Sequence, residues 1–124
     1  VDLVYRLPYL LQQGGVTFCL QNEGDMDAMN VRNLPFLAGT AMAYGLSEEE
    51  AVKAITLNAC KILGIDQHYG SIEVGKSATL YISTGNALDM RTNQARFIIS
   101  EGNFLPVSNF QKELYQKYRK KYGL

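Results

Sequence analysis

The pattern of hydrophobic and polar residues changes character near residue 64 of this chain. Before that point the apolar residues recur with the period of an amphipathic helix. After it they come in short runs of strand-forming residues separated by turn residues. The first part predicts helices at residues 6–13, 34–44 and 47–62; the second predicts strands at residues 78–83, 96–100 and 104–107, and a last helix that begins after Ser108.

Residues that begin and end helices occupy suitable places in the first part. The first helix would hold Pro8 in its first turn, where a missing N–H is harmless. Asn33 is a predicted N-cap, and Ser47 with Glu50 has the spacing of a capping box. Gly64 is expected to adopt the left-handed conformation that ends a helix. The third helix is expected to bury a stripe of Val52, Ile55, Ala59 and Ile62, and to carry an ion pair between Glu49 and Lys53.

Residues 16–20 form a short apolar run behind a pair of glycines. This pattern predicts a strand that is buried on both faces, as in a parallel sheet. Residues 21–25 are polar and follow that strand directly. In α/β folds the carboxyl end of a strand is the edge that carries the chemistry.

The last third of the chain predicts a hairpin and a helix. Glu101, Gly102 and Asn103 separate two strand-like runs and are typical of a hairpin turn. Ser108 and Gln111 have the spacing of a second capping box. The helix that follows has an apolar stripe, expected to dock on the domain, of Phe110, Leu114, Tyr118 and Tyr122. Binding of the basic, tyrosine-rich segment 112–122 to an acidic partner is the alternative.

Composition and charge exclude several classes of protein. The 124 residues suffice for one compact domain, and a hydrophobic content of 47% is too high for a disordered chain. Twelve basic and twelve acidic residues cancel, so neither nucleic acid nor a membrane is an expected partner. Cys19 and Cys60 lack the spacing of a metal or redox motif and are expected to be buried thiols.

The most specific motif has two parts, GLSEEEAVKAITLNACKILGI at residues 45–65 and GSIEVGKSATL at residues 70–80. It resembles the end of an amidohydrolase-superfamily enzyme of the imidazolonepropionase-like branch, in which the pattern GLSxxEAxxAxTxNxAKxLGI is followed by GSIExGKxADL. The upstream segment GGVTFCL…NLPFLAGTAMAYGL also matches the end of that family's barrel. Ser77 and Thr79, where the family usually has aspartates, are expected to affect only the local turn.

Three structural expectations concern residues inside this motif. Asn58 lies late on its helix, where its amide could bond a neighbouring loop. Residues 71–73 are expected to form a short paired segment between two glycines. Lys76 follows a turn and is expected to be solvated.

The resemblance implies a fold and a reaction. Family members have a (β/α)8 barrel with a metal site at the carboxyl mouth of its strands, and a β-sandwich built from both ends of the chain. An HxH pair, further histidines and an aspartate after the eighth strand hold the metal, which lowers the pKa of its bound water and polarises the carbonyl under attack. The chain is therefore expected to be α/β: residues 1–64 end the barrel, residues 65–107 form the C-terminal part of the sandwich, and residues 108–124 form a last helix.

Few residues of the implied metal site occur here. The one histidine, His68, follows a turn and is expected to lie in a surface loop. Glu23 aligns with the eighth-strand aspartate, and Asp25 is the nearby alternative. A glutamate is one methylene longer, which would shift the geometry of a general base. The alternative is that Glu23, Asp25 and Asp27 only solvate a loop. Zinc or another divalent metal is expected in the whole protein, and no metal or cofactor site within this chain.

A complete (β/α)8 barrel needs about 250 residues. We therefore expect a truncated, proteolytic or gene-split C-terminal fragment of a hydrolase that acts on carbon–nitrogen bonds of small cyclic or linear amides, inactive alone. Its expected partner is the missing N-terminal part of the same protein or a second copy, because Val16, Phe18 and Leu20 would otherwise be exposed. A catalytically dead scaffold or an interaction domain is the alternative. The sequence does not decide the compartment.

Overall fold

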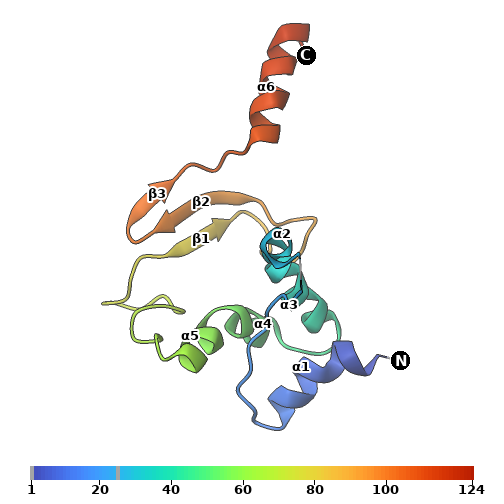
Figure 1. The fold of residues 1–124 in the computed structure, drawn as a ribbon, viewed down its shortest axis with the longest axis vertical. Coiled ribbons are helices and arrows are strands. Elements are labelled where there is room, and N and C mark those ends of the chain that lie inside the picture. Colours follow the sequence, from blue (N-terminus) through green and yellow to red (C-terminus); the bar gives the residue numbers. More distant parts are fainter. Residues whose placement is uncertain (1, 25) are drawn as a thin grey trace.

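The computed structural model describes residues 2–24 and 26–124 and has a helical part, a small sheet and a last helix (Figure 1). The sheet lies between the helical part and the last helix. The helical part contains α1 (Leu3–Gln13), α2 (Asp27–Asn30), η1 (Val31–Asn33), α3 (Leu34–Ala43), α4 (Glu48–Ile55) and α5 (Leu57–Leu63). It is followed by β1 (Leu80–Ser83), β2 (Ala95–Ser100), β3 (Asn103–Leu105) and α6 (Phe110–Tyr122).

Helix α1 is longer than predicted at its start. It begins at Leu3, so Pro8 lies inside the helix and not in its first turn. A proline there removes one backbone donor and leaves one carbonyl without its helical partner. The helix ends before Gly14, as predicted. Tyr5 of α1 stacks on Tyr44 with the ring centroids 5.1 Å apart, which holds α1 against the end of α3.

Residues 16–20 are extended but do not pair with any described strand, so the predicted strand is wrong for this chain. A strand requires a neighbour that satisfies its backbone hydrogen bonds. The described sheet is built from β1, β2 and β3 and lies elsewhere. The apolar side chains divide instead: Phe18 and Leu20 pack against the helical core, and Val16 is 51% exposed.

Helix α3 follows directly on the 3₁₀ turn η1 and not on a capping residue. Asn33 has helical backbone angles and forms no side-chain cap with a described residue, so the predicted N-cap is wrong. An N-cap needs an extended backbone, which the preceding 3₁₀ turn does not allow. The end of the helix agrees with prediction, since Gly45 follows it with a φ of 112°.

The helix predicted at residues 47–62 is broken into α4 and α5 at Thr56. The Thr56 hydroxyl donates to the Val52 carbonyl at 2.7 Å, a bond of the kind that bends helices. The predicted apolar stripe is half right: Ile55 packs against the core and Ala59 is half-buried, whereas Val52 and Ile62 are 41% and 53% exposed. The buried residues of α4 are Ala51 and Ala54.

The ends of these two helices follow the sequence more closely. The Ser47 hydroxyl accepts the backbone N–H of Glu50 at 3.3 Å, which confirms Ser47 as the N-cap of α4. The Glu50 carboxylate does not complete the capping box, because it accepts from Lys53 at 2.9 Å. Lys53 also pairs with Glu49 at 2.7 Å, as predicted. Gly64 ends α5 in the left-handed conformation, with a φ of 70°.

The sheet is antiparallel with the order β1-β2-β3. The predicted hairpin is confirmed, with a shorter turn: Asn103 already pairs with Ser100. Glu101 and Gly102 form the turn with φ values of 49° and 82°, as a type I′ turn requires. Residues 71–73, predicted to pair, lie outside the sheet.

The turn of this hairpin is held by the segment before β1. The Thr79 hydroxyl accepts the backbone N–H of Glu101 at 3.1 Å, and the Gly102 N–H donates to the Ala78 carbonyl at 3.0 Å. Ser77 lies 3.1 Å from Thr79, hydroxyl to hydroxyl. Thr79 therefore acts across 22 residues, and the prediction of a purely local effect is wrong.

Small residues form the centre of the core. The fully buried cluster comprises Ala38, Ala41, Leu46, Ala51 and Leu88. Leu88 comes from the loop between β1 and β2, so this loop closes the core of the helical part. In the same loop the Asn86 amide donates to the Glu48 carboxylate at 2.8 Å. The helical part and the sheet are therefore joined by packing and by a hydrogen bond.

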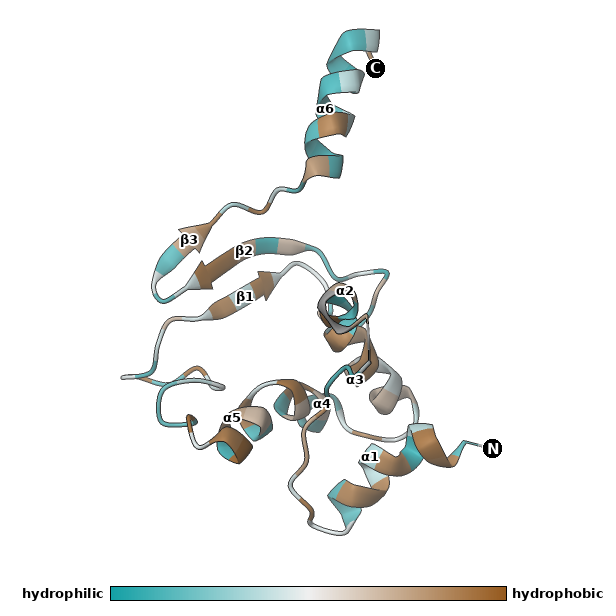
Figure 2. Ribbon diagram, viewed as in Figure 1, coloured by the Kyte–Doolittle hydropathy of each residue, from teal (hydrophilic) through white to brown (hydrophobic). Residues whose placement is uncertain are grey.

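The N-cap of helix α6 lies one residue later than predicted. Asn109, and not Ser108, accepts the backbone N–H of Lys112, at 2.9 Å. The helix stands apart from the helical part, so the predicted docking of its apolar stripe is wrong (Figure 1). Figure 2 shows apolar and polar residues interleaved along its surface.

Candidate functional site

The extended segment at residues 16–20 is fixed to the helices at two points. The side-chain amide of Asn58 donates to the Phe18 carbonyl at 3.1 Å. The Leu20 N–H donates to the Ala54 carbonyl at 2.9 Å. Asn58 lies on α5 and Ala54 on α4, so both helices hold the segment. The expected loop contact of Asn58 is confirmed, and its partner is this segment.

The middle of the same segment leaves backbone donors open. Among the described residues, no backbone carbonyl accepts the N–H groups of Thr17, Phe18 or Cys19. Backbone donors are rarely left without a partner in a finished core. The segment thus forms no helix or strand and leaves these three donors without a described backbone partner.

The candidate acid Glu23 lies three residues beyond Leu20 and is exposed. No described residue forms a salt bridge with it. Its loop is closed by Asn22, whose amide donates to the Asn30 carbonyl at 3.1 Å. The second candidate, Asp25, lies outside the described residues. Glu23 is therefore positioned by the segment before it and the loop after it, with no charged partner in the described chain.

The donor set of the described residues does not fit a metal site. They contain no group of three or more His, Cys, Asp or Glu side chains that could hold an ion. His68 is exposed, as expected, in a turn that its backbone stabilises: its N–H donates to Ile65 and its carbonyl accepts from Ser77. Cys19 and Cys60 are half-buried and form no disulfide. Any metal site would need ligands from outside the described residues.

One cluster does bring together nucleophilic and charged side chains. The Lys76 amine donates to the Ser71 hydroxyl at 2.5 Å, and Ser71 donates to the Glu73 carboxylate at 2.5 Å. The Lys76 side chain is only 12% exposed, so the expectation that it is solvated is wrong. The hydrogen bond from Ser71, followed by that from Lys76, lowers the pKa of Glu73.

This cluster is a turn clamp and not a catalytic dyad. The Ser71 hydroxyl donates to the Glu73 carboxylate and accepts from the Lys76 amine, so the lysine is not placed as a base for the serine. The Lys76 amine also pairs with the Glu73 carboxylate at 3.2 Å. The three residues instead hold the loop between α5 and β1 together.

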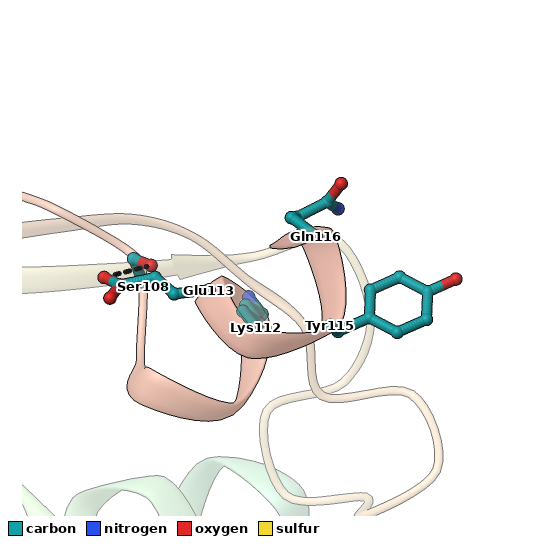
Figure 3. Close-up of a pocket in the computed structure, with 5 residues that line it drawn as sticks. All are labelled: Ser108, Lys112, Glu113, Tyr115 and Gln116. Carbon is teal, nitrogen blue, oxygen red and sulfur yellow. Dashed lines mark hydrogen bonds between the residues drawn. The ribbon is translucent and has the colours of Figure 1, made fainter. Parts of the chain in front are cut away.

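The surface hollow at the start of α6 is not an enclosed site (Figure 3). It is lined by Ser108, Lys112, Glu113, Tyr115 and Gln116. Ser108 donates to the Glu113 carboxylate at 3.4 Å, and Tyr115 and Gln116 point away from that pair (Figure 3). No side chains converge there as a reaction would require.

The sequence profile of the amidohydrolase family matches residues 6–108. The chain belongs to the amidohydrolase family. The resemblance in its motifs is thereby confirmed. The matched part of the chain includes the extended segment, Asn58 and the Ser71–Lys76 clamp, and it stops before α6.

The chain is similar over part of its length to two imidazolonepropionases. It is 39% identical to that of Shewanella baltica (strain OS185) over 70 residues, which are 56% of this chain and 17% of the relative. It is 35% identical to that of Pseudomonas aeruginosa (strain UCBPP-PA14) over 71 residues, which are 55% and 17% of the two chains. The chain thus spans about a sixth of the length of these curated relatives.

The fold is similar to the crystal structure of an amidohydrolase from Thermotoga maritima MSB8. The two superpose with a TM-score of 0.72 at 31% identity, over 82% of this chain and 26% of that chain. An α/β amidohydrolase-like fold is therefore confirmed. No helix among the described residues is long and apolar enough to cross a membrane.

Proposed function

We propose that this chain is the closing part of a metal-dependent amidohydrolase that hydrolyses a carbon–nitrogen bond in a small cyclic or linear amide. Residues 16–20 would be the last strand of a (β/α)8 barrel, and β1, β2 and β3 the C-terminal strands of a composite β-sandwich. The chain alone would be inactive.

The observation that carries this proposal is the state of residues 16–20. They are extended, held by Asn58 and Ala54, and lack backbone partners at Thr17, Phe18 and Cys19. A last barrel strand without its neighbours would have these properties. The neighbours would come from the rest of the same protein or from a second copy.

Glu23 is the proposed catalytic acid, with Asp25 as the alternative. Glu23 lies three residues beyond Leu20, where the resemblance implies the eighth-strand acid. Catalytic groups of (β/α)8 barrels project from the carboxyl ends of strands. The exposure of Glu23 is consistent with a group that faces a mouth formed by other segments.

The metal-dependent chemistry would rest on ligands outside this chain. Amidohydrolases generally use a divalent metal, but the described residues offer no cluster that could hold one. This chain would contribute one acid and the strand that carries it. The whole protein would bind zinc or another divalent ion.

The relatives indicate the chemical class of the substrate but not the individual compound. Both relatives that match over about 70 residues are imidazolonepropionases, which favours a cyclic amide such as an imidazolone. The groups that choose a substrate lie on loops that this chain does not supply. A linear amide is the second possibility to test.

A catalytically dead scaffold is the alternative function. One observation favours it: the candidate acid is a glutamate, whose longer side chain would shift the geometry of a general base. In that case the chain would serve only to complete a structure or to bind a partner.

The test is hydrolysis by the whole protein that carries this sequence. It should be purified with its metal and assayed against imidazolone, hydantoin and dipeptide substrates, before and after treatment with a chelator. We expect hydrolysis of at least one substrate, its loss on chelation, its return with zinc, and none by residues 1–124 alone. Hydrolysis that survives full removal of the metal would contradict the proposal.

Variants of Glu23 distinguish the enzyme from the scaffold. In the whole protein, Glu23→Gln should lower kcat by about 100-fold or more if Glu23 is the catalytic acid, since general acid–base groups contribute that much. Gln12→Glu offers a control change of charge on α1. If Glu23→Gln leaves kcat unchanged, Asp25 becomes the candidate for the catalytic acid, and Asp25→Asn tests it. A whole protein that binds zinc and hydrolyses none of the substrates would favour the scaffold.

A further inference from the structure

The charges of this chain are segregated, although they cancel in total. Helix α6 holds one acid, Glu113, and five of the twelve basic residues: Lys112, Lys117, Arg119, Lys120 and Lys121. Its net charge is therefore +4. The other residues have seven basic and eleven acidic side chains, a net charge of −4. The net charge of zero is therefore the sum of a cationic helix, α6, and an anionic remainder of the chain.

Most aromatic and basic residues of α6 lie on different faces. Successive helical residues are rotated by about 100°. Phe110, Leu114, Tyr118 and Tyr122 recur every fourth residue and share one face, with Tyr115 at its border. Lys112 and Arg119 flank this face on one side, Lys117 flanks it on the other, and Lys120 lies opposite. Lys121 lies within the face, and its amine is over the Tyr122 ring at 5.3 Å from the centroid.

The aromatic face is not covered by the described residues. Its exposed fractions are 68% for Phe110, 47% for Tyr118 and 64% for Tyr122. The helix stands clear of the helical part and follows residues 106–109, which form no helix or strand (Figure 1). The match to the amidohydrolase family ends at residue 108, before α6 begins.

We propose that α6 binds the surface of an anionic lipid bilayer. The helix would lie in the plane of the interface, with its aromatic face at the level of the headgroups and its flanking lysines and arginine at the lipid phosphates. A basic polar face opposite an aromatic one is the arrangement of interfacial helices. Tyrosine and lysine suit this depth, because each joins an apolar body to a polar tip.

The negative charge of the residues outside α6 determines which part of the chain would contact the membrane. An anionic surface attracts α6 and repels the remaining residues, so the chain would bind through the helix alone. The earlier expectation of no membrane partner rested on the total charge, which averages over this separation. The proposal concerns binding at the surface and does not require a helix that spans the bilayer.

A nucleic acid is the less favoured anionic partner. Single-stranded nucleic acids are bound by a groove in which basic and aromatic side chains act on the same strand. On α6 only Lys121 lies among the aromatic side chains, and the other four basic residues lie on other faces. Nucleic-acid binding is therefore kept as an outcome of the test.

The absence of tryptophan from the sequence allows a position-specific probe. Tyr118→Trp places a fluorophore on the aromatic face, and Gln116→Trp places one on the opposite face without changing the charge. Each variant is mixed with vesicles of phosphatidylcholine containing about one third phosphatidylglycerol, and with pure phosphatidylcholine. We expect a blue shift and quenching by brominated lipid for Tyr118→Trp on anionic vesicles only, and neither for Gln116→Trp. Equal responses from the two positions, or none from either, would overturn the proposal.

Sedimentation with the same vesicles tests the charges. Lys117→Gln/Lys120→Gln/Lys121→Gln should weaken binding on the order of 100-fold. The matched control removes three exposed basic residues from the body, as Arg6→Gln/Lys61→Gln/Arg96→Gln, and should bind as well as the parent chain. Binding should fall at about 500 mM NaCl, where the Debye length is near 4 Å. Equal loss in both triple variants, or tighter binding to an oligonucleotide that displaces the vesicles, would contradict a lipid surface.

Discussion

The side-chain amide of Asn58 donates a hydrogen bond to the backbone carbonyl of Phe18, 40 residues earlier in the chain, at 3.1 Å. This bond joins the family motif on α5 to the extended segment that precedes the candidate acid. It gives a physical reason for an asparagine at position 58. The Phe18 carbonyl is not paired with a described strand, and the side-chain N–H of Asn58 supplies its donor.

Removal of this amide should destabilise the chain. Asn58→Ala leaves the Phe18 carbonyl without its donor, and we expect the free energy of unfolding to fall by about 1 to 2 kcal/mol. Urea unfolding monitored by circular dichroism measures the change. Asn33 is a matched control, because it is exposed and its side chain caps nothing among the described residues. Equal losses from Asn58→Ala and Asn33→Ala would show that the bond contributes nothing specific.

Gly39 should be intolerant of alanine, against the usual preference of helices. A Cβ at this position of α3 would lie 2.2 Å from the Leu88 carbonyl oxygen, a backbone atom that cannot move aside cheaply. Gly39→Ala should therefore destabilise the chain by about 2 kcal/mol or more, although alanine normally gains about 1 kcal/mol within a helix. Gly14→Ala is the control, because its Cβ would meet only ordinary contacts of 3.5 Å. Thermal unfolding distinguishes the two, and a Gly39→Ala variant as stable as the parent would refute the close contact.

The turn between β2 and β3 has a residue that can be improved. Glu101 has a φ of 49°, which asparagine adopts more readily than glutamate. Glu101→Asn should raise the free energy of unfolding by about 0.5 kcal/mol, and Gly102→Ala should lower it by about 1 kcal/mol because its φ is 82°. Denaturant midpoints measure both changes. The same sign of change in both variants would contradict the turn type.

The Ser71–Lys76 clamp should respond to acid. The pKa of Glu73 is held below its ordinary value of 4.5 by the hydrogen bond from Ser71 and then by Lys76. A lowered pKa in the folded state means that ionised Glu73 stabilises the loop above pH 4.5, and that this stabilisation is lost as the pH falls through the folded pKa. Exchange of the Ser77 amide, which donates to the His68 carbonyl, reports on the loop. Below pH 4.5 we expect the protection factor of this amide to fall in the parent and to stay constant in Glu73→Gln.

Local signals in the sequence predicted most of the elements, and the errors have a common cause. Ser47, Gly64 and the Glu101–Gly102 turn are specified by neighbouring residues, and the structure confirms them. The break at Thr56 and the cap at Asn109 depend on which of several hydroxyl or amide groups finds a backbone partner, which spacing alone does not decide.

The extended segment at residues 16–20 shows more clearly what a sequence pattern cannot predict. Its apolar, β-branched pattern is that of a buried strand, but strands need partners that the pattern does not describe. Likewise, the Asn58 bond could be anticipated as a contact to some loop, whereas its acceptor, Phe18, required the structure. Leu88 gave no signal as a core residue, because its burial depends on a loop closing over α3. For the candidate site, the sequence identified Glu23 and Asp25 through the family motif, and their catalytic role stays a prediction.

Hydrogen exchange of the backbone amides of Thr17, Phe18 and Cys19 tests the central claim most directly. In residues 1–124 alone these amides have no described backbone acceptor and should exchange nearly as fast as in an unfolded chain. In the whole protein we expect protection to rise at least about 100-fold, because neighbouring barrel strands would accept them. Exchange that is equally fast in the whole protein would show that this segment is not a barrel strand.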